Sequence, residues 1–448
     1  MPGLSGRARG LVGAFCRSNA FILFAGTALG QAMPILLSPV LTRLFPPREF
    51  GTLGVFSAVC MSLIPLVTMR YELALLLVKE AKDVAAVLTL NALAISAMTL
   101  IAALATMVFP WQDYPQLSDL YEVRAFLPVA LLAIGTYQIL VYEATRADRF
   151  RAIARTKLIQ GFAGPFSQIS FGLAGLGTVG LIGGFVISQS FGAAYLFRTL
   201  VAPRWAQLRA TEFATLRRLA RRHVRFPLLS SWSNVLQEAG TQYAAVVLMM
   251  TFFGTTIAGY LFLADRIVGR PLLMVSTSVL QSFSGELSRA IHEVSTEIRG
   301  KYLRVLAIQF GLNLIWCSAV YLAVPNFVVW LFGAAWGDAV VYIQTMCFIY
   351  LFQATMHPVY PTLQLLERQG TAAVFEVVRL IAVSAVIIST ASLQTAPPTA
   401  LAWYAVTQAG FQILLFLLQL TAINAAVEVA RGERSRATAS SNVERRPN

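Results

Sequence analysis

The chain has little charge. Asp, Glu, Lys and Arg make up only 12% of its 448 residues, whereas hydrophobic residues make up 57%. Soluble domains carry roughly 25% charged residues. This shortage excludes an ordinary soluble globular protein and predicts a polytopic membrane protein.

Cysteine and histidine are also scarce, and neither forms a metal or catalytic pattern. They stand singly along the chain, as Cys16, Cys60, Cys317, Cys347, His223, His292 and His357. Without CxxC pairs, neither a disulfide framework nor a metal site is indicated. No GxxxxGK[ST] or HExxH pattern occurs either. We therefore expect no metal and no cofactor.

Long apolar runs are what the sequence has in abundance. A membrane-spanning helix needs about 20 predominantly apolar residues. Runs of this length predict an all-α polytopic membrane protein with about twelve transmembrane helices. The runs are 19–44, 51–78, 84–109, 125–143, 158–177, 180–201, 226–252, 256–280, 302–324, 338–360, 371–393 and 399–425.

The basic residues are distributed unevenly between these runs. The chain has 35 Lys and Arg and 21 Asp and Glu, for a net charge of +14. If the N-terminus is cytoplasmic, 28 of the 35 basic residues lie in cytoplasmic segments, and only Arg43, Arg48 and Arg124 lie outside. This bias predicts that both termini are cytoplasmic. It also accounts for the positive charge without nucleic acid as a partner.

A basic run lies at the midpoint of the chain. RRLARRHVRF, residues 217–226, separates the sixth apolar run from the seventh. We interpret it as a topological signal that also contacts anionic membrane lipids. Paired halves with a substrate site between them are usual in secondary transporters. We expect an N-terminal six-helix lobe at 1–201, a basic cytoplasmic linker at 202–225, a C-terminal six-helix lobe at 226–427 and a disordered tail at 428–448.

The longest loop predicted outside the membrane, residues 110–124, carries Asp113, Asp119 and Glu122. We interpret these acids as a solvated surface, not as a paired-carboxylate active site. A membrane polymerase or ligase acting on lipid-linked glycans would need a larger external loop with catalytic residues. The sequence therefore favours a protein that is not an enzyme.

Ionisable residues inside the predicted spans are the main functional candidates, because a charge in the bilayer is costly and usually faces a cavity or a partner. They are Arg70, Arg266, Arg270, Arg379, Glu72, Glu143, Glu238, Asp265 and Glu376. Arg266 and Arg270 are four residues apart, which predicts that they share one face of the eighth span. Two guanidinium groups there suit a phosphate-bearing substrate. The alternative is structural pairing, with Asp265 or Glu238 as the partner of Arg266; Arg270 has no obvious acid on its own face.

Two carboxylates are candidates for ion coupling. Glu238 and Asp265 are predicted at similar depths in spans seven and eight. A buried carboxylate whose cationic neighbour is claimed by an arriving anion can take up a proton. Permanent pairing with arginine is the alternative for both. Glu376 and Arg379, three residues apart, are predicted to satisfy one another.

Spans one and two show further irregularities. In a continuous helix Arg70 would lie about 13 Å inside span two, and Glu72, two residues on, would point to another face and could not pair with it. We expect Arg70 to face a cavity, with a structural role for both residues as the alternative. In span one, Pro34 and Pro39 each remove a backbone hydrogen bond and kink the helix, while Gln31 offers a polar contact. These three residues predict a hinge or cavity wall.

Several segments, taken in order, resemble the oligosaccharide flippases of the multidrug/oligosaccharidyl-lipid/polysaccharide exporter superfamily, which includes O-antigen and exopolysaccharide repeat-unit translocases. The segments are Gln31 and Pro39, RLFPPREFG at 43–51, RYELA at 70–74, Phe226-Pro227, GYLFLADRIVGRP at 259–271 and LFGAAW at 331–336. Their order and spacing carry the resemblance. Arg48 departs from it, because many relatives have an acidic or neutral residue at this point.

The resemblance implies translocation of an undecaprenyl-diphosphate-linked glycan across the bacterial inner membrane, by alternating access of two lobes around a V-shaped cavity. It implies a cationic cavity, and the matching residues are Arg43, Arg70, Arg266 and Arg270. Polysaccharide polymerase and chain-length proteins are the implied partners. Two other transporters remain as alternatives: a multidrug or metabolite exporter of the same superfamily, which would favour an aromatic, acidic cavity, and a peptidoglycan-precursor flippase, which two additional spans would favour.

Overall fold

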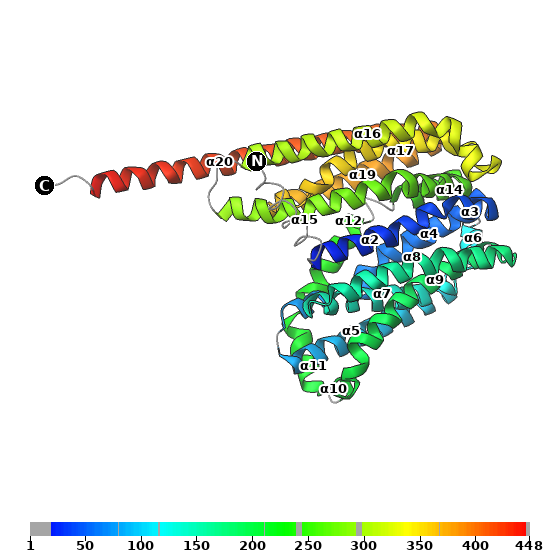
Figure 1. The fold of residues 1–448 in the computed structure, drawn as a ribbon, viewed down its shortest axis with the longest axis horizontal. Coiled ribbons are helices and arrows are strands. Elements are labelled where there is room, and N and C mark those ends of the chain that lie inside the picture. The colour runs from blue at the N-terminus through cyan, green and yellow to red at the C-terminus, as the bar shows by residue number, and fades with distance from the viewer. Residues whose placement is uncertain are drawn as a thin grey trace, which may run out of the picture. The chain divides into compact units, whose positions relative to one another are not determined.

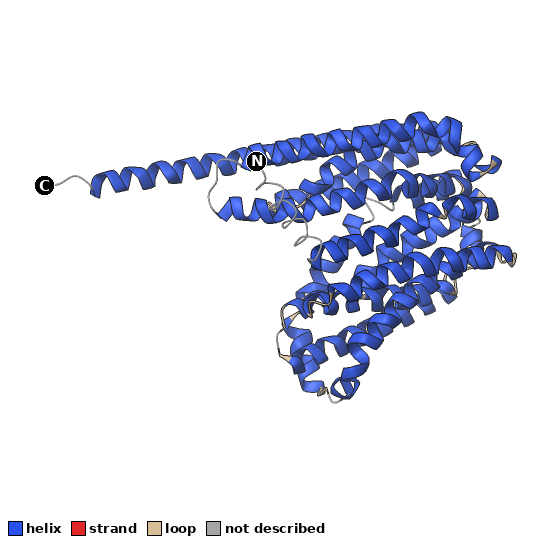
Figure 2. Cartoon of the chain, in the orientation of Figure 1, coloured by secondary structure: helices blue, strands red, loops and turns tan. Residues whose placement is uncertain are grey.

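The structure, a computed structural model, describes residues 19–78, 80–114, 117–209, 211–238, 244–292, 298–366 and 368–444. Helices joined by turns and short loops account for these ranges, which contain no strand (Figure 2). The all-α fold expected from the sequence is confirmed. Helices satisfy their own backbone hydrogen bonds, as segments inside a bilayer must.

The chain forms two compact units. The first contains Met1–Phe262 and Val329–Gly337, and the second contains Leu263–Val328 and Asp338–Asn448. The longer helices up to the start of the second unit are α2 (Asn19–Leu36), α3 (Ser38–Leu44), α4 (Pro47–Val67), α5 (Ala81–Val108), α7 (Phe126–Arg146), α8 (Phe150–Leu173), α9 (Gly177–Leu196), α11 (Phe213–Arg222), α12 (Ser231–Glu238), α13 (Ala244–Phe253) and α14 (Thr255–Ala264). Those that follow are α15 (Arg270–His292), α16 (Ile298–Phe332), α17 (Ala339–Met356), α19 (Gln369–Ser392) and α20 (Pro397–Glu444).

The compact units do not follow the predicted lobe boundary. Helices α12 and α13, which the sequence assigned to the C-terminal lobe, group with the first unit because both pack against α4. The division into lobes at 1–201 and 226–427 remains a prediction. The structure also describes the backbone of α20 as helical to Glu444, whereas the sequence predicts disorder from 428. Ala, Glu and Arg in this segment favour helix and can extend the apolar span beyond its last apolar turn.

Glycine allows close packing in the first unit, where α8 lies along both α2 and α9 (Figure 1). A Cβ added to Gly30 of α2 would lie 2.3 Å from the carbonyl oxygen of Lys157 in α8. In the other direction, a Cβ added to Gly161 would lie 2.2 Å from the oxygen of Gly30. Small residues at such contacts let helix backbones approach closely, which is a common way of packing helices in membranes.

Span one is broken between its two prolines. Helix α2 ends at Leu36 and α3 begins at Ser38, so Leu37 interrupts the helix. Pro39 lies in the first turn of α3, where its missing N–H leaves no intrahelical bond unmade. The Ser38 hydroxyl donates to the Pro34 carbonyl at 2.6 Å. The structure confirms a break between the two prolines, but the prediction that Pro39 removes a helical hydrogen bond was wrong. The role of Gln31, Pro34 and Pro39 as a hinge or cavity wall remains a prediction.

Span two is not the continuous helix that the sequence predicts for 51–78. Helix α4 ends at Val67, and a 3₁₀ helix, η1, covers Tyr71–Leu76. Between them Met69 and Arg70 have φ angles of 50° and 55°. Non-glycine residues seldom adopt this left-handed conformation. Two of them in succession turn the chain, and hydropathy alone does not reveal such a turn.

Span eight contains one wider turn. A π-helical turn, η8, covers Asp265–Gly269 between α14 and α15. Its hydrogen bonds run from i to i+5, so residues five apart in sequence come onto the same face. Asp265 and Arg270, which are five residues apart, meet across this turn. The shared face predicted for Arg266 and Arg270 remains a prediction.

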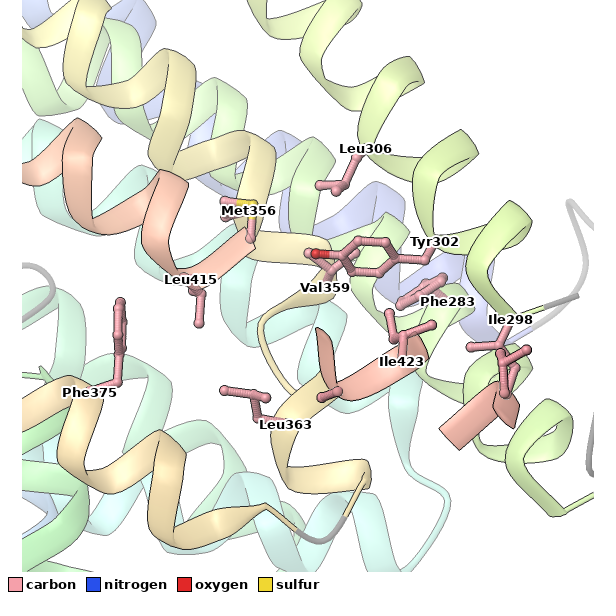
Figure 3. Close-up of a cluster of buried hydrophobic side chains, with 12 residues drawn as sticks. Phe283, Ile298, Tyr302, Leu306, Met356, Val359, Leu363, Phe375, Leu415 and Ile423 are labelled. Carbon is pink, nitrogen blue, oxygen red and sulfur yellow. The ribbon is translucent and has the colours of Figure 1, made fainter. Parts of the chain in front are cut away.

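The second unit has its own apolar core, shown in Figure 3. Tyr302 of α16 lies at its centre, fully buried, with Phe283 of α15 and Ile423 of α20 beside it. The Tyr302 hydroxyl donates to Oε1 of Gln419 at 2.9 Å, so the polar end of this ring is satisfied. Helices α15, α16 and α20 thus share a packed interior in which the Tyr302 hydroxyl is paired.

Eight helices in the described ranges are individually long and apolar enough to cross a membrane. The four remaining predicted spans include helices broken at Leu37 or at η8, and α8, which carries Arg151, Arg155 and Lys157 near its start. The twelve-helix count is consistent with this arrangement. The chain is a multi-pass membrane protein.

Candidate functional site

Arg70 and Glu72 form the charged centre of the break in span two. Arg70 Nη1 lies 3.7 Å from Glu72 Oε1, and the Glu72 side chain is only 1% exposed. The prediction that these two charges cannot neutralise each other was therefore wrong. It assumed a continuous helix, whereas the left-handed turn at Arg70 brings residues i and i+2 together. Arg70 also follows the end of α4, so it does not lie in the middle of a helix.

The pairing in this turn is incomplete. Arg70 Nε and Glu72 Oε2 are buried and have no hydrogen-bond partner in the described part of the chain. A buried polar atom without a partner costs about 1–3 kcal/mol. The unpaired atoms and the left-handed backbone occur in the same turn. Both features cost free energy, and features of this kind are often retained at functional sites.

Arg43 lies where two of the motif segments meet in the first unit. Its Nη2 donates to the Trp330 carbonyl oxygen at 2.9 Å, while the indole N–H of Trp336 donates to the Thr42 carbonyl oxygen at 3.0 Å. The Trp336 ring also contacts Phe50 edge-on, with 5.2 Å between centroids. RLFPPREFG and LFGAAW, almost 300 residues apart, are therefore in direct contact, and the Arg43 side chain remains exposed beside them.

Another motif segment, GYLFLADRIVGRP, packs against RLFPPREFG through a glycine in each segment. A Cβ added to Gly51 would lie 1.8 Å from the Thr255 carbonyl oxygen, and one added to Gly259 would lie 1.9 Å from that of Pro47. Helices α4 and α14 thus touch backbone to backbone. The motifs therefore have a packing role that is separate from any contact with substrate.

Asp265 is the centre of the charged cluster in the second unit. It accepts from Arg270 Nε at 2.9 Å and from the Tyr350 hydroxyl through a very short hydrogen bond. The expectation that Arg270 lacks an acid on its own face was wrong, because the π turn places Asp265 and Arg270, five residues apart, side by side. The Arg270 side chain is nevertheless 50% exposed. Its guanidinium group is accessible although an acid holds it.

The structure gives fewer contacts for the two remaining candidates, Arg266 and Glu238. Arg266 lies in the same π turn as Asp265 and is partly buried. Glu238 ends α12, and its side chain lies outside the described residues. The substrate and ion-coupling roles of Arg43, Arg70, Arg266, Arg270, Glu238 and Asp265 remain predictions.

Glu376 and Arg379 pair in α19, as expected from their spacing. Their carboxylate and guanidinium groups form a salt bridge, and the Tyr360 hydroxyl also donates to Glu376. Arg379 is completely buried and lies over the Phe375 ring, with 5.7 Å from Cζ to the ring centroid. This cluster supports a structural role because Arg379 has no exposed surface to offer a ligand.

Tyr350 is the residue that sequence reasoning missed. It lies 85 residues from Asp265, on α17, in a span that carries no intramembrane charge. Its ring also closes over Gly269, where an added Cβ would meet the Tyr350 Cζ at 2.4 Å. A buried tyrosine needs a hydrogen-bond partner, but the sequence gives no sign of which partner it finds.

The fold matches solved transporter structures over nearly its whole length. One is described as the inward-facing conformation of a multidrug resistance MATE family transporter of the MOP superfamily; it is 15% identical, has a TM-score of 0.59, and the match covers 89% of this chain and 96% of that one. An outward-facing conformation of a transporter described in the same terms is 12% identical, with a TM-score of 0.55 and coverage of 91% and 96%. A MATE in a bent conformation is 15% identical, with a TM-score of 0.51 and coverage of 92% and 95%.

These matches define the class: a multi-pass membrane protein with the MATE fold. The family of polysaccharide biosynthesis proteins matches residues 40–341, and the chain belongs to it. The family resemblance predicted from the motif segments is confirmed. No curated protein matches the sequence.

Proposed function

We propose that the chain is a flippase that moves undecaprenyl-diphosphate-linked oligosaccharide repeat units across the bacterial inner membrane by alternating access, for surface polysaccharide assembly. Membership in the polysaccharide biosynthesis family, combined with the fold of a transporter superfamily, supports this proposal. In this proposal the protein is not an enzyme, both termini are cytoplasmic, and polysaccharide polymerase and chain-length proteins are its partners. The polyprenyl tail stays in lipid while the polar head crosses inside the protein.

The observation that carries the proposal is the half-exposed Arg270, held by Asp265 within an apolar span. A permanently charged guanidinium that is accessible at this depth suits a diphosphate, whose oxygens it can bind through two parallel hydrogen bonds. Arg266, in the same turn, adds a second positive charge. Arg43 and Arg70 in the first unit are the other proposed contacts.

The ion pair also offers a route to ion coupling. An arriving diphosphate would compete with Asp265 for Arg270. A carboxylate that loses its cationic neighbour in a poorly hydrated site favours its protonated form. Asp265 would then take up a proton as substrate binds and release it when Arg270 returns, and Tyr350 would hold the carboxyl group in place during both steps.

Complementation tests the proposal. In a strain that lacks the transporter, Arg266→Ala and Arg270→Ala should abolish surface glycan at unchanged protein abundance, and lipid-linked repeat units should accumulate in the inner leaflet. Arg304→Ala, which removes an exposed arginine from α16, is the matched control and should complement fully. Full complementation by both test variants would contradict the phosphate-binding role.

A multidrug or metabolite exporter is the second candidate, because the matching structures include multidrug transporters. The arginines at the two charged clusters argue against a cationic drug as substrate. Drug susceptibility separates the two functions: deletion of an exporter lowers the inhibitory concentration of cationic drugs, whereas deletion of a flippase removes glycan. A peptidoglycan-precursor flippase would instead be required for viability when surface glycan synthesis is blocked.

A further inference from the structure

A basic cavity opens in the first unit, at the start of α8 and the end of α9. Its volume is about 370 Å³, which is within the range of small-ligand sites. Its polar walls come from two parts of the chain that are at least 40 residues apart. They are formed by Asp148, Arg149, Arg151, Arg155, Tyr195 and Thr199.

The charge in this cavity is not balanced by neighbouring acids. Within the described ranges, Arg149, Arg151 and Arg155 form no salt bridge. The nearby buried carboxylate of Glu143 is already bound by two other residues, Arg146 at 2.7 Å and Arg204 at 2.9 Å. Three guanidinium groups therefore face one carboxylate, that of Asp148.

The opposite wall supplies hydroxyl groups. Arg155 Nη1 donates to the Tyr195 hydroxyl at 3.4 Å, which places this hydroxyl beside the arginines. The Thr199 hydroxyl, one turn further on, donates to the Tyr195 carbonyl oxygen at 2.7 Å. Because the Thr199 hydroxyl donates to this carbonyl oxygen, the guanidinium groups and the Tyr195 hydroxyl are the cavity's donors for phosphate oxygens.

We infer that this cavity binds a phosphate group, carried either by a membrane lipid or by a soluble phosphate ester. The site is separate from the Asp265–Arg270 cluster and does not depend on the proposed flippase activity. Arg151 and Arg155, one turn apart on α8, bind the phosphate oxygens together. Asp148 opposes binding, because its carboxylate repels the same anion.

The experiment uses the full chain in nanodiscs and has two arms that distinguish the sources. In phosphatidylcholine nanodiscs, inorganic diphosphate is titrated by calorimetry. In nanodiscs that also contain phosphatidylglycerol, native mass spectrometry measures the retained lipid. Both arms are repeated in an Arg270→Ala background, so that binding at the proposed transport site is measured separately.

The test variant is Arg151→Gln/Arg155→Gln, and the matched control is Arg299→Gln/Arg304→Gln, which removes the same charge from exposed positions on α16. Loss of two charge-assisted contacts should weaken binding at least about tenfold in the arm that contains the true ligand. The control should change it by less than about twofold. Asp148→Asn should tighten binding, a gain that misfolding cannot produce.

If the test variant loses only diphosphate binding, the ligand is a soluble phosphate ester. If it loses only the retained lipid, the ligand is a lipid headgroup. If it loses both, the site accepts either. Test and control variants that behave alike in both arms would overturn the inference, as would an Asp148→Asn variant that binds no more tightly than the wild type.

Discussion

Gly51 of α4 and Gly259 of α14 lie back to back, so that a Cβ added to Gly51 would come within 2.9 Å of the Gly259 nitrogen and 1.8 Å of the Thr255 oxygen. Gly51→Ala should therefore force the two helices apart. Overpacking of this kind costs about 1–3 kcal/mol of stability. We expect a lower melting temperature in detergent and reduced abundance in the membrane. Gly410→Ala, where an added Cβ has nothing within 4 Å, is the control and should melt like the wild type.

Glu376→Ala should destabilise the protein more than most substitutions, because it leaves the fully buried Arg379 without its acid. Removing one partner of a buried ion pair costs about 3–5 kcal/mol. Replacing both, as Glu376→Leu/Arg379→Met, should recover most of that loss, since no buried charge remains. Thermal melts of the single and double variants measure this difference. A double variant as unstable as Glu376→Ala would show that the charges have a role beyond their mutual pairing.

Asp119 should make stability depend on pH. The Arg48 guanidinium, which Asp119 binds at 2.7 Å, lowers the pKa of this carboxyl group, and a hydrogen bond with Thr255 lowers it further, against the opposing effect of burial. A carboxyl group with a lowered pKa in the folded state stabilises the protein above its unfolded pKa, about 3.9. That contribution is lost as the pH falls from about 5 through the folded-state pKa.

The effect should be small, at most about 1 kcal/mol, because the Arg48 side chain is 66% exposed. Asp119→Asn should lower the melting temperature at pH 7 and flatten its decline between pH 6 and pH 3. Asp113→Asn, an exposed acid in the same loop, should leave the wild-type curve unchanged. Parallel curves for the wild type and Asp119→Asn would rule out this pair as a source of acid sensitivity.

Asp265→Asn should separate substrate binding from ion coupling. The amide keeps the size of the carboxylate but releases Arg270 from its ion pair, so we expect tighter binding of a lipid diphosphate. Transport should fall and lose its dependence on the proton gradient, because the amide cannot take up a proton. Binding and flux in proteoliposomes measure the two effects. A variant with wild-type flux that still responds to the gradient would place the proton elsewhere.

Much of the fold could be predicted from local composition. The apolar runs locate the helices because each span must bury about 20 residues in lipid, and that requirement is met within one segment. The break near Pro34 and Pro39 could be predicted for the same reason, since proline acts on its own turn. The pairing of Glu376 with Arg379 followed from helical spacing.

The predictions failed where backbone geometry departs from the regular helix. The left-handed turn at Met69 and Arg70 allows Arg70 and Glu72 to meet, and the π turn allows Asp265 to meet Arg270. Neither segment contains proline within the turn, and the hydropathy is that of an ordinary span. The stabilising contacts come from elsewhere in the fold, such as Tyr350 on α17.

The sequence by itself determined that this chain crosses the membrane many times as helices and carries arginines where lipid would exclude them, because the cost of burying a charge or an unsatisfied backbone applies to each segment separately. Only the tertiary structure decided that Arg70 meets Glu72, that Arg270 meets Asp265, and how much of each arginine stays accessible. Those outcomes depend on turns that depart from the regular helix, and the contacts that hold such turns, like that of Tyr350 with Asp265, come from distant helices.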